Sequence, residues 1–164
     1  MDAATKQDAG ERMKDAFRRY PTGVAVITAA GADGPVGLTA SSVASVSVDP
    51  PALSFSVMGT RSARALLTAP SFVVHLLGAR HAGLARAFSR SAGDRFTPDQ
   101  GWSRLPTGEP ILLDAVAALR GERLRLVPVG DATLVVAAVL DVFHGPADRP
   151  LIHHSRKFIT PEEC

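Results

Sequence analysis

Hydroxyl-bearing side chains crowd residues 37–51, which read GLTASSVASVSVDPP. They fall on two short strand-like stretches, residues 39–42 and 45–48, which end at an Asp-Pro-Pro turn. A strand that only fills a core favours branched apolar residues at such positions. Small hydroxyls beside exposed backbone N–H groups suit a polar, phosphate-bearing ligand that lies across the strands. A solvated strand pair with its serines on the wet face fits the same pattern.

Five arginines gather within one region of the chain: Arg80, Arg86, Arg90, Arg95 and Arg104. Such a group attracts phosphate-rich cofactors, but it also fits a solvated helix followed by a loop. The solvated interpretation is favoured unless a phosphate site lies nearby. The formal net charge is only +2, which does not indicate nucleic-acid binding.

The composition is that of a globular domain, with 46% hydrophobic and 21% charged residues, and a length of 164 residues fits one core. The single cysteine, Cys164, excludes a disulfide within the chain and a cysteine-based metal site. No apolar run approaches the ~20 residues that a membrane span needs, and residues 1–14 lack the apolar core of a signal peptide. We therefore expect a cytoplasmic protein with no membrane partner.

Hydrophobic periodicity predicts many strands and few helices. Residues 1–10 are expected to form a flexible N-terminal tail, ahead of a single domain at 11–160. Short helices are predicted at 11–20, 60–68 and 80–89, and a long loop at 90–110. Strands are predicted at 22–29, 37–48, 52–57, 71–77 and 132–143, with two more within 115–129 and a last one at 151–154. Because there is no regular βαβ alternation, this order predicts a mostly antiparallel β-barrel.

Several well-known site motifs are absent from the sequence. There is no GxGxxG between a strand and a helix, no GxxxxGK[ST] and no GxSxG elbow. His153 and His154 are adjacent, so on a strand they point to opposite faces and cannot hold one metal. His75 lies in an apolar run and is predicted to be a hydrogen-bonded core residue. We predict no metal site and no catalytic acid–base residue; hydride transfer to an aromatic cofactor needs stacking and orientation instead.

Several segments, in order, resemble the flavin reductase-like family, whose FMN-binding split-barrel proteins supply reduced flavin to partner monooxygenases. They are FRRYPTGVAVITA at 17–29, GLTASSVASVSVDPP at 37–51, SAGDRF at 91–96, Trp102, GEPILLDAVAAL at 108–119, Gly130-Asp131 and PLI at 150–152. The segment at 37–51 is fairly specific, and the others support it. The likeness spans roughly residues 14–158.

The resemblance implies a mostly β, antiparallel split β-barrel with a few short helices, which forms a homodimer with flavin at the subunit interface. It implies FMN or FAD as cofactor, NADH or NADPH as co-substrate and a flavin-dependent monooxygenase as partner. The implied flavin-binding residues are Thr39, Ala40, Ser41, Ser42, Ser47, Ser56, Ser62, Phe88, Arg95 and Phe96. A phosphate prefers hydroxyls and amides near a helix start, which residues 60–64 would supply. For Phe88, core packing remains the favoured interpretation.

One position departs from the family pattern. Family members usually carry Gly-Asp-His, with the histidine on the nicotinamide side of the site, where this chain has Gly130-Asp131-Ala132. The main hypothesis is an NAD(P)H-dependent flavin reductase. The alternative is a flavin-binding non-reductase module, or a flavoprotein reduced by a partner. An oxidase acting on a small substrate ranks last, because no basic cluster suits such a substrate.

Overall fold

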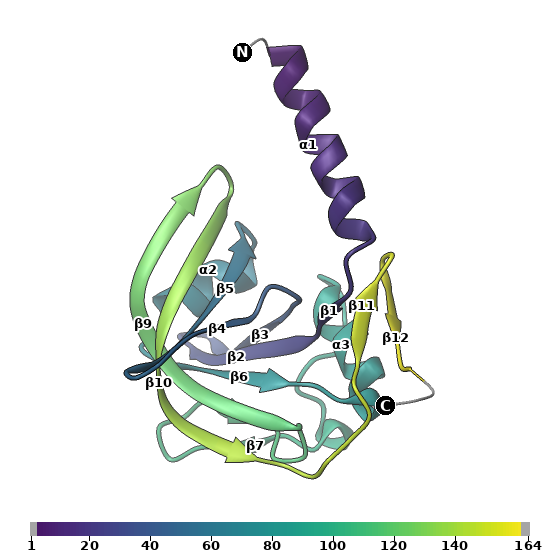
Figure 1. Ribbon diagram of the computed structural model, residues 1–164. Coiled ribbons are helices and arrows are strands. Elements are labelled where there is room, and N and C mark those ends of the chain that lie inside the picture. Colours follow the sequence, from purple (N-terminus) through teal and green to yellow (C-terminus); the bar gives the residue numbers. More distant parts are fainter. Residues whose placement is uncertain (1–2, 162–164) are drawn as a thin grey trace.

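A seven-stranded antiparallel sheet curls into the barrel that dominates the computed structural model, which describes residues 3–161 (Figure 1). Its strand order is β3-β2-β6-β9-β10-β5-β4. The strands are β2 (Ala25–Gly31), β3 (Gly34–Ala40), β4 (Ala44–Val48), β5 (Pro51–Met58), β6 (Phe72–Leu76), β9 (Ala117–Val129) and β10 (Ala132–His144). The predicted mostly antiparallel β fold is confirmed.

The two edges of this sheet approach each other at one end of the barrel. Edge strands β3 and β4 are joined only by residues 41–43. There, Ser42 Oγ accepts a hydrogen bond from Ser56 N at 2.9 Å and lies 3.2 Å from Ser56 O. The barrel is therefore split beside the hydroxyl-rich segment, where edge-strand N–H groups lack a neighbouring strand.

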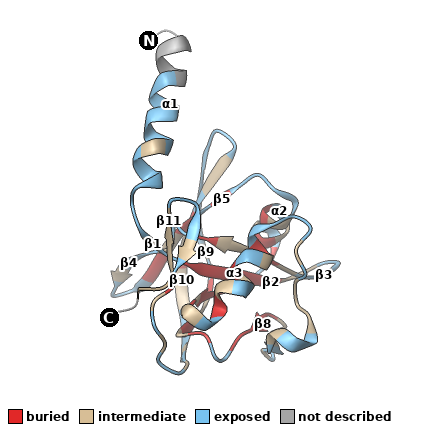
Figure 2. Cartoon of the chain, turned by 90° about the vertical axis from the view of Figure 1, so that its right-hand side faces the viewer, coloured by how far each residue is buried: buried red, intermediate tan, exposed pale blue. Residues whose placement is uncertain are grey.

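The interior is aliphatic with a few well-placed aromatic rings. Strand β5 alternates as its sequence predicts, with Leu53, Phe55 and Val57 buried and Ser56 exposed. Phe55 and Phe72 meet edge to face, with ring centroids 5.3 Å apart. Figure 2 shows this buried layer inside the barrel, with the exposed surface on the hairpins and helices.

Three α-helices accompany the sheet in the described part of the chain. Helix α1 (Ala3–Arg18) extends away from the barrel (Figure 1), whereas α2 (Arg61–Thr68) and α3 (Ala82–Ser89) pack against it. Helix α1 begins earlier than the predicted 11–20 helix and includes residues 3–10, where we expected a flexible tail. Its alanine, lysine, glutamine and glutamate residues favour helix. Residues 1 and 2 lie outside the described part of the chain.

Short elements complete the fold. They are β1 (Thr22–Gly23), β7 (Ser103–Arg104), β8 (Pro110–Ile111), β11 (Ile152–His154), β12 (Lys157–Ile159) and the 3-10 turns η1 (Ala79–His81) and η2 (Pro98–Gln100). Strands β1, β11 and β12 form a separate sheet in the order β1-β11-β12. This small sheet brings the C-terminal segment next to the end of α1 (Figure 1).

The prediction of two strands within 115–129 is wrong, because β9 is continuous through Gly121. A Cβ at this position would lie only 2.8 Å from Ala138 O. Gly121 therefore serves a close approach between β9 and β10 rather than a break in the strand.

Two buried polar residues stabilise the interior by different means. His75 is a core histidine, as predicted, with its Nδ1 2.9 Å from Val26 O; burial lowers the pKa of His75 to about 4. Glu109 is 1% exposed and accepts hydrogen bonds from Ser71 and Thr107 and from Arg120 Nε at 2.8 Å. Burial by itself would raise the pKa of Glu109, but these donors outweigh it and lower the pKa to about 2.

Within residues 3–161, no helix has the length and apolar character that crossing a bilayer requires. In the same described range, no three His, Cys, Asp or Glu residues group as potential metal ligands.

Candidate functional site

A hollow of about 750 Å³ opens at the split of the barrel, between β3, β5 and the start of α2; we call it the β3–α2 hollow. It brings together most of the residues that the resemblance singled out. Those lining it are Thr39, Ala40, Ser41, Ser42, Ser56, Ser62, Phe88 and Arg95. Ser47, on β4, and Phe96 do not line it.

The hydroxyls of the hollow are not equally available to a ligand. Thr39 Oγ1 donates to Ala85 O at 2.7 Å, which ties β3 to α3. Ser42 Oγ is held by Ser56, as described above. Because β3 pairs with β2 alone, the N–H groups on its other edge face the split and are free of a neighbouring strand. Backbone N–H groups on this edge are therefore available to a polar ligand, in addition to the hydroxyls that the sequence pointed to.

One end of the hollow suits an anion. Thr60 caps helix α2 by accepting from Ala63 N at 3.2 Å, and no acidic residue lies in the first turn. The N–H groups of that turn and the helix dipole attract a phosphate. Arg61 lies at the same end of the hollow and adds positive charge.

Arg95 also lines the end of the hollow at the start of α2. Its Nη1 donates to Gly37 O at 2.9 Å and to Ser62 Oγ at 3.1 Å, and its guanidinium lies 5.7 Å from the centroid of the Phe88 ring. Its Nε is buried and has no hydrogen-bond partner among the described residues. An unsatisfied buried donor on a cation is costly without a ligand, so this end of the hollow fits the phosphate of a flavin nucleotide.

Phe88 fits both interpretations that the sequence left open. It is 1% exposed, it packs against Phe96 with ring centroids 5.0 Å apart, and its ring still forms part of the wall of the hollow. The ring reaches β3 because residue 37 is glycine: a Cβ on Gly37 would lie 2.6 Å from Phe88 Cε1. Phe96 and Trp102 pack behind Phe88. The ring centroids of Phe96 and Trp102 are 5.1 Å apart, and those of Phe88 and Trp102 are 5.5 Å apart.

Sequence reasoning missed the contribution of the C-terminal hairpin. His153 of β11 and Phe158 of β12 line the hollow, and their ring centroids are 5.7 Å apart. His153 was considered only as a metal ligand together with His154. No local signal could have found this role, because the pairing of His153 with Thr22 of β1 depends on tertiary structure.

The sequence matches the flavin reductase like domain over residues 17–161. The chain belongs to this family.

Named relatives and solved structures agree with the family assignment. The NADH:FMN oxidoreductase of Rhodococcus erythropolis is 43% identical over 151 residues, covering 89% of this chain and 79% of the relative. The crystal structure of a flavin reductase domain protein from Arthrobacter sp. FB24 matches with a TM-score of 0.87 at 33% identity, covering 94% of this chain and 97% of the other. The styrene monooxygenase flavin reductase of Pseudomonas putida S12 matches with a TM-score of 0.82 at 29% identity, covering 93% and 98%.

In this flavin reductase-like domain, Ala132 lies at the first position of β10, opposite Met58 of β5. Met58 lines the β3–α2 hollow but Ala132 does not. The preceding turn is held against the start of α2, because Gly59 N donates to Asp131 O at 2.9 Å. The position where the family usually has histidine is therefore one strand away from the lining of the hollow in this chain.

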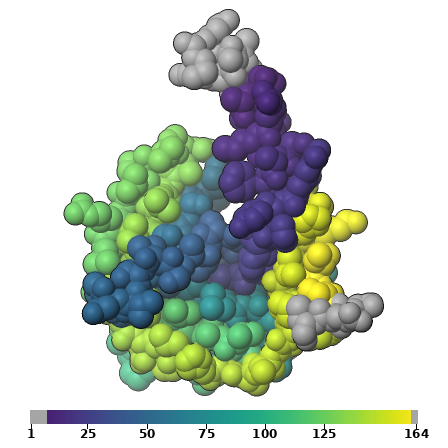
Figure 3. Space-filling model, viewed as in Figure 1, coloured from purple at the N-terminus to yellow at the C-terminus, as the bar shows by residue number. Residues whose placement is uncertain are grey.

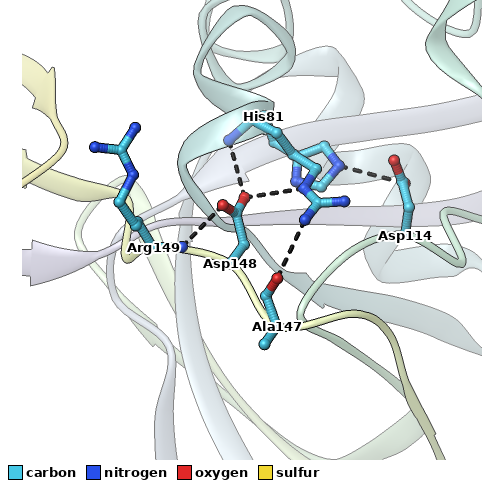
Figure 4. A network of polar contacts seen from close by, with 6 residues as sticks. His81, Asp114, Ala147, Asp148 and Arg149 are labelled. Atoms are coloured by element: carbon cyan, nitrogen blue, oxygen red, sulfur yellow. Dashed lines mark hydrogen bonds and ion pairs between the residues drawn. The ribbon is translucent and has the colours of Figure 1, made fainter. Parts of the chain in front are cut away.

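A polar network outside the hollow anchors the segment that leads to β11 (Figure 4). Arg80 N and Nε donate to Asp148 Oδ2 at 2.9 and 3.1 Å, and Arg80 Nη2 donates to Ala147 O at 3.2 Å. The hydrogen bond from the Arg80 backbone is the main cause of the lowered pKa of Asp148. His81 Nε2 lies 3.3 Å from Asp114 Oδ1 beside this network.

The five arginines between residues 80 and 104 have different roles in the structure. Arg80 serves as an anchor for the C-terminal segment, and Arg104 Nη1 donates to Gly108 O at 3.1 Å. Of the five arginines, Arg95 is the one that lines the β3–α2 hollow. The solvated or structural interpretation therefore holds for the others, and the phosphate interpretation fits Arg95.

Proposed function

We propose that this protein is an NAD(P)H-dependent flavin reductase that transfers hydride from a nicotinamide cofactor to FMN. The observation that supports the proposal is the β3–α2 hollow, in which the start of α2 and Arg95 form an end suited to a phosphate beside the unpaired edge of β3. When bound, the flavin supplies the two-electron acceptor, and the protein orients it. The name of the Rhodococcus erythropolis relative, NADH:FMN oxidoreductase, supports FMN and NADH.

The residues of the hollow would divide the work of holding the flavin. Arg95, Ser62 and the first turn of α2 would bind its phosphate, and the edge of β3 at residues 39–42 would donate backbone hydrogen bonds to the polar rim of the ring. Phe88 and Phe158 would cover its apolar part. This arrangement needs no acid–base side chain at the reacting atoms, since stacking and orientation govern hydride transfer.

Anaerobic mixing of the FMN-loaded protein with NADH is expected to bleach the visible absorbance of the flavin within one turnover. Each pairing of FMN or FAD with NADH or NADPH, followed by stopped-flow absorbance, identifies the preferred flavin and nicotinamide. FMN and NADH without protein serve as the control. Absence of bleaching in all four pairings would contradict the proposed activity.

The same experiment separates the second candidate, a flavin-binding module that is reduced by a partner. Ala132 motivates it, because the family usually has histidine at this position. That candidate predicts a yellow protein that retains FMN and is not bleached by NADH or NADPH. The distance of Ala132 from the lining of the hollow within one protomer favours the reductase.

We further propose that the protein passes reduced flavin to a flavin-dependent monooxygenase. The named likeness to the flavin reductase of styrene monooxygenase supports this role. The exposed, open form of the hollow fits a flavin that enters and leaves during turnover.

A homodimer is proposed on the basis of the exposed apolar surface of the β9–β10 hairpin. Val127 and Leu134 face each other across the hairpin on its outward side and are 43% and 39% exposed, and Val129 on the same side is 67% exposed. Leu126 on the opposite side is 43% exposed. A hairpin that is apolar on both sides and extends past the barrel needs a covering surface, and a second copy supplies one.

Sedimentation of the protein is expected to give twice the mass of the 17.2 kDa chain. Val127→Asp should shift the protein to the monomer, because it places a charge in the centre of the proposed interface. Leu113→Asp is the control, since Leu113 is 55% exposed and lies outside the hairpin. A monomer at all concentrations, or a Val127→Asp dimer as tight as the unaltered one, would contradict the proposal.

A further inference from the structure

Gln100 makes three side-chain hydrogen bonds within the segment that follows α3, although it does not line the β3–α2 hollow. Its Oε1 accepts from Thr97 N at 3.2 Å and from Trp102 Nε1 at 2.9 Å, and its Nε2 donates to Asp94 O at 2.9 Å. Asp94 O and Thr97 N belong to the peptide groups on either side of residues 95–96. A single side chain therefore fixes the backbone on both sides of this residue pair.

The backbone between these two contacts is strained. Phe96 has a φ angle of 58°, in the left-handed region that favours glycine. Strain of this kind persists only where the surrounding structure over-determines the backbone. Here the Gln100 hydrogen bonds hold the peptide groups before and after Phe96, and its ring packs against Phe88 and Trp102. The strained turn therefore depends on Gln100 together with the aromatic rings.

The strained turn directs two adjacent side chains to different partners. Arg95 donates to Gly37 O at 2.9 Å and to Ser62 Oγ at 3.1 Å, at the end of the hollow that suits a phosphate. The ring of Phe96 instead lies among the aromatic rings behind the hollow. Rotation about the N–Cα bond of Phe96 separates the two side chains. The backbone angle that Gln100 helps to hold thus sets where the Arg95 guanidinium lies relative to the aromatic rings.

Helix α1 takes no part in holding this segment. It projects from the body of the molecule in the space-filling view (Figure 3). In the part of the chain that the structure describes, the side-chain hydrogen bonds of residues 94–102 go to one another or to residues 37, 62 and 90. The bond to residue 90 joins Arg95 Nη2 to Arg90 O, just after α3. The position of Arg95 is therefore set locally, by the end of α3, the wall of the hollow and Gln100.

We propose that Gln100 is the positioning residue that sets the preference of the flavin site for FMN over riboflavin. It acts through Arg95, whose guanidinium it directs to the end of the hollow that suits a phosphate. This inference rests on the proposed function. An arginine that is already ordered binds a phosphate more tightly than a mobile one, because less side-chain entropy is lost when the ligand arrives. Riboflavin has no phosphate, so its binding should not depend on Gln100.

Gln100→Met tests this role, because methionine keeps the length of the side chain but donates no hydrogen bond and accepts only weakly. The Kd for FMN should rise about tenfold, since a charge-assisted contact loses its orientation, while the Kd for riboflavin should change less than about twofold. Ser103→Ala is the matched control. Ser103 is exposed, follows Trp102 and does not line the hollow, so both Kd values should stay unchanged.

The double variant Arg95→Ala/Gln100→Met shows whether Gln100 acts through Arg95. If it does, Gln100→Met should weaken FMN binding by less than about twofold once Arg95 is absent, so the two effects should not add. Additive weakening would overturn the inference, because Gln100 would then support the site by another route. Equal weakening of FMN and riboflavin by Gln100→Met, or an FMN Kd that neither single substitution changes, would overturn it as well.

The single tryptophan of the chain reports on the Gln100 contact itself. Trp102 Nε1 donates to Gln100 Oε1, so Gln100→Met should shift the emission maximum of Trp102 while the far-ultraviolet circular dichroism stays unchanged. If Gln100→Met does not fold, Gln100→Asn provides the same comparison of FMN with riboflavin, because its shorter amide cannot span all three partners.

These binding measurements need no nicotinamide, which separates this inference from the proposed activity. If Gln100→Met weakens FMN selectively through Arg95 but neither NADH nor NADPH bleaches the bound flavin, the proposed activity fails and the positioning role remains. If the flavin is bleached but Gln100→Met binds FMN as tightly as the unaltered protein, the activity remains and the positioning role is wrong.

Discussion

Replacing Glu109 by glutamine is expected to lower the free energy of unfolding by about 3 kcal/mol, which lowers Tm by about 6–12 °C. The carboxylate is 1% exposed and is the partner of Arg120 at 2.8 Å, with Ser71 and Thr107 as further donors. Glutamine keeps the shape of the side chain but leaves the partly buried Arg120 without a counter-charge. Chemical denaturation followed by circular dichroism measures the loss.

The pH dependence of stability provides a second readout of the same carboxylate. Its pKa is about 2 in the folded protein and 4.5 in the unfolded chain, so the unfolded state binds more protons between these values. The stabilisation by Glu109 is therefore complete above pH 4.5 and is lost as the pH falls toward 2. The unfolding free energy of Glu109→Gln should fall less steeply in this range than that of the unaltered protein.

Two controls show whether the buried charge is responsible. Asp15→Asn removes the exposed ion pairs of Asp15 with Arg19 at 3.0 Å and with Arg18 at 3.6 Å and should cost at most about 1 kcal/mol. Replacing Glu109 and Arg120 together by leucine and methionine should recover most of the loss, because no charge is then left unpaired. A Glu109→Gln variant as stable as Asp15→Asn would contradict this account of the interior.

Arg95→Ala is expected to weaken FMN binding 10- to 100-fold, since charge-assisted contacts to a phosphate are worth about 1.5–3 kcal/mol. The expectation follows from the buried Nε without a partner and from the position of Arg95 beside Ser62 and the start of α2. Quenching of flavin fluorescence on binding gives the Kd for FMN and for riboflavin, which has no phosphate.

The comparison of the two ligands distinguishes phosphate binding from support of the wall. Arg95 also holds Gly37 O, so its loss could loosen β3. If Arg95 binds phosphate, the affinity for riboflavin should change little while that for FMN falls. Arg86→Ala is the matched control, because Arg86 is exposed on α3 and does not line the β3–α2 hollow. Equal weakening of FMN and riboflavin would assign Arg95 to the wall alone.

The strands were largely predictable because strand periodicity is a local property. The alternation of leucine, phenylalanine and valine with serine in β5 predicted which of its faces is buried. The missed features have non-local causes. Two strands were predicted within 115–129, but β9 continues through Gly121, which accommodates Ala138 O from a strand that follows later in the chain. Helix α1 was predicted too short because its first turns have no apolar face to reveal them.

For the candidate site, the sequence alone determined that residues 37–51 form a polar, strand-borne surface, and the motif within them indicated the family. Only the tertiary structure decided which groups remain available there. It ties Thr39 to α3 and Ser42 to β5, leaves Arg95 Nε without a partner, and brings His153 and Phe158 to the same hollow. The physical reason is that residue type and periodicity act between near neighbours, whereas barrel closure and hydrogen-bond partners join segments that lie far apart in the chain.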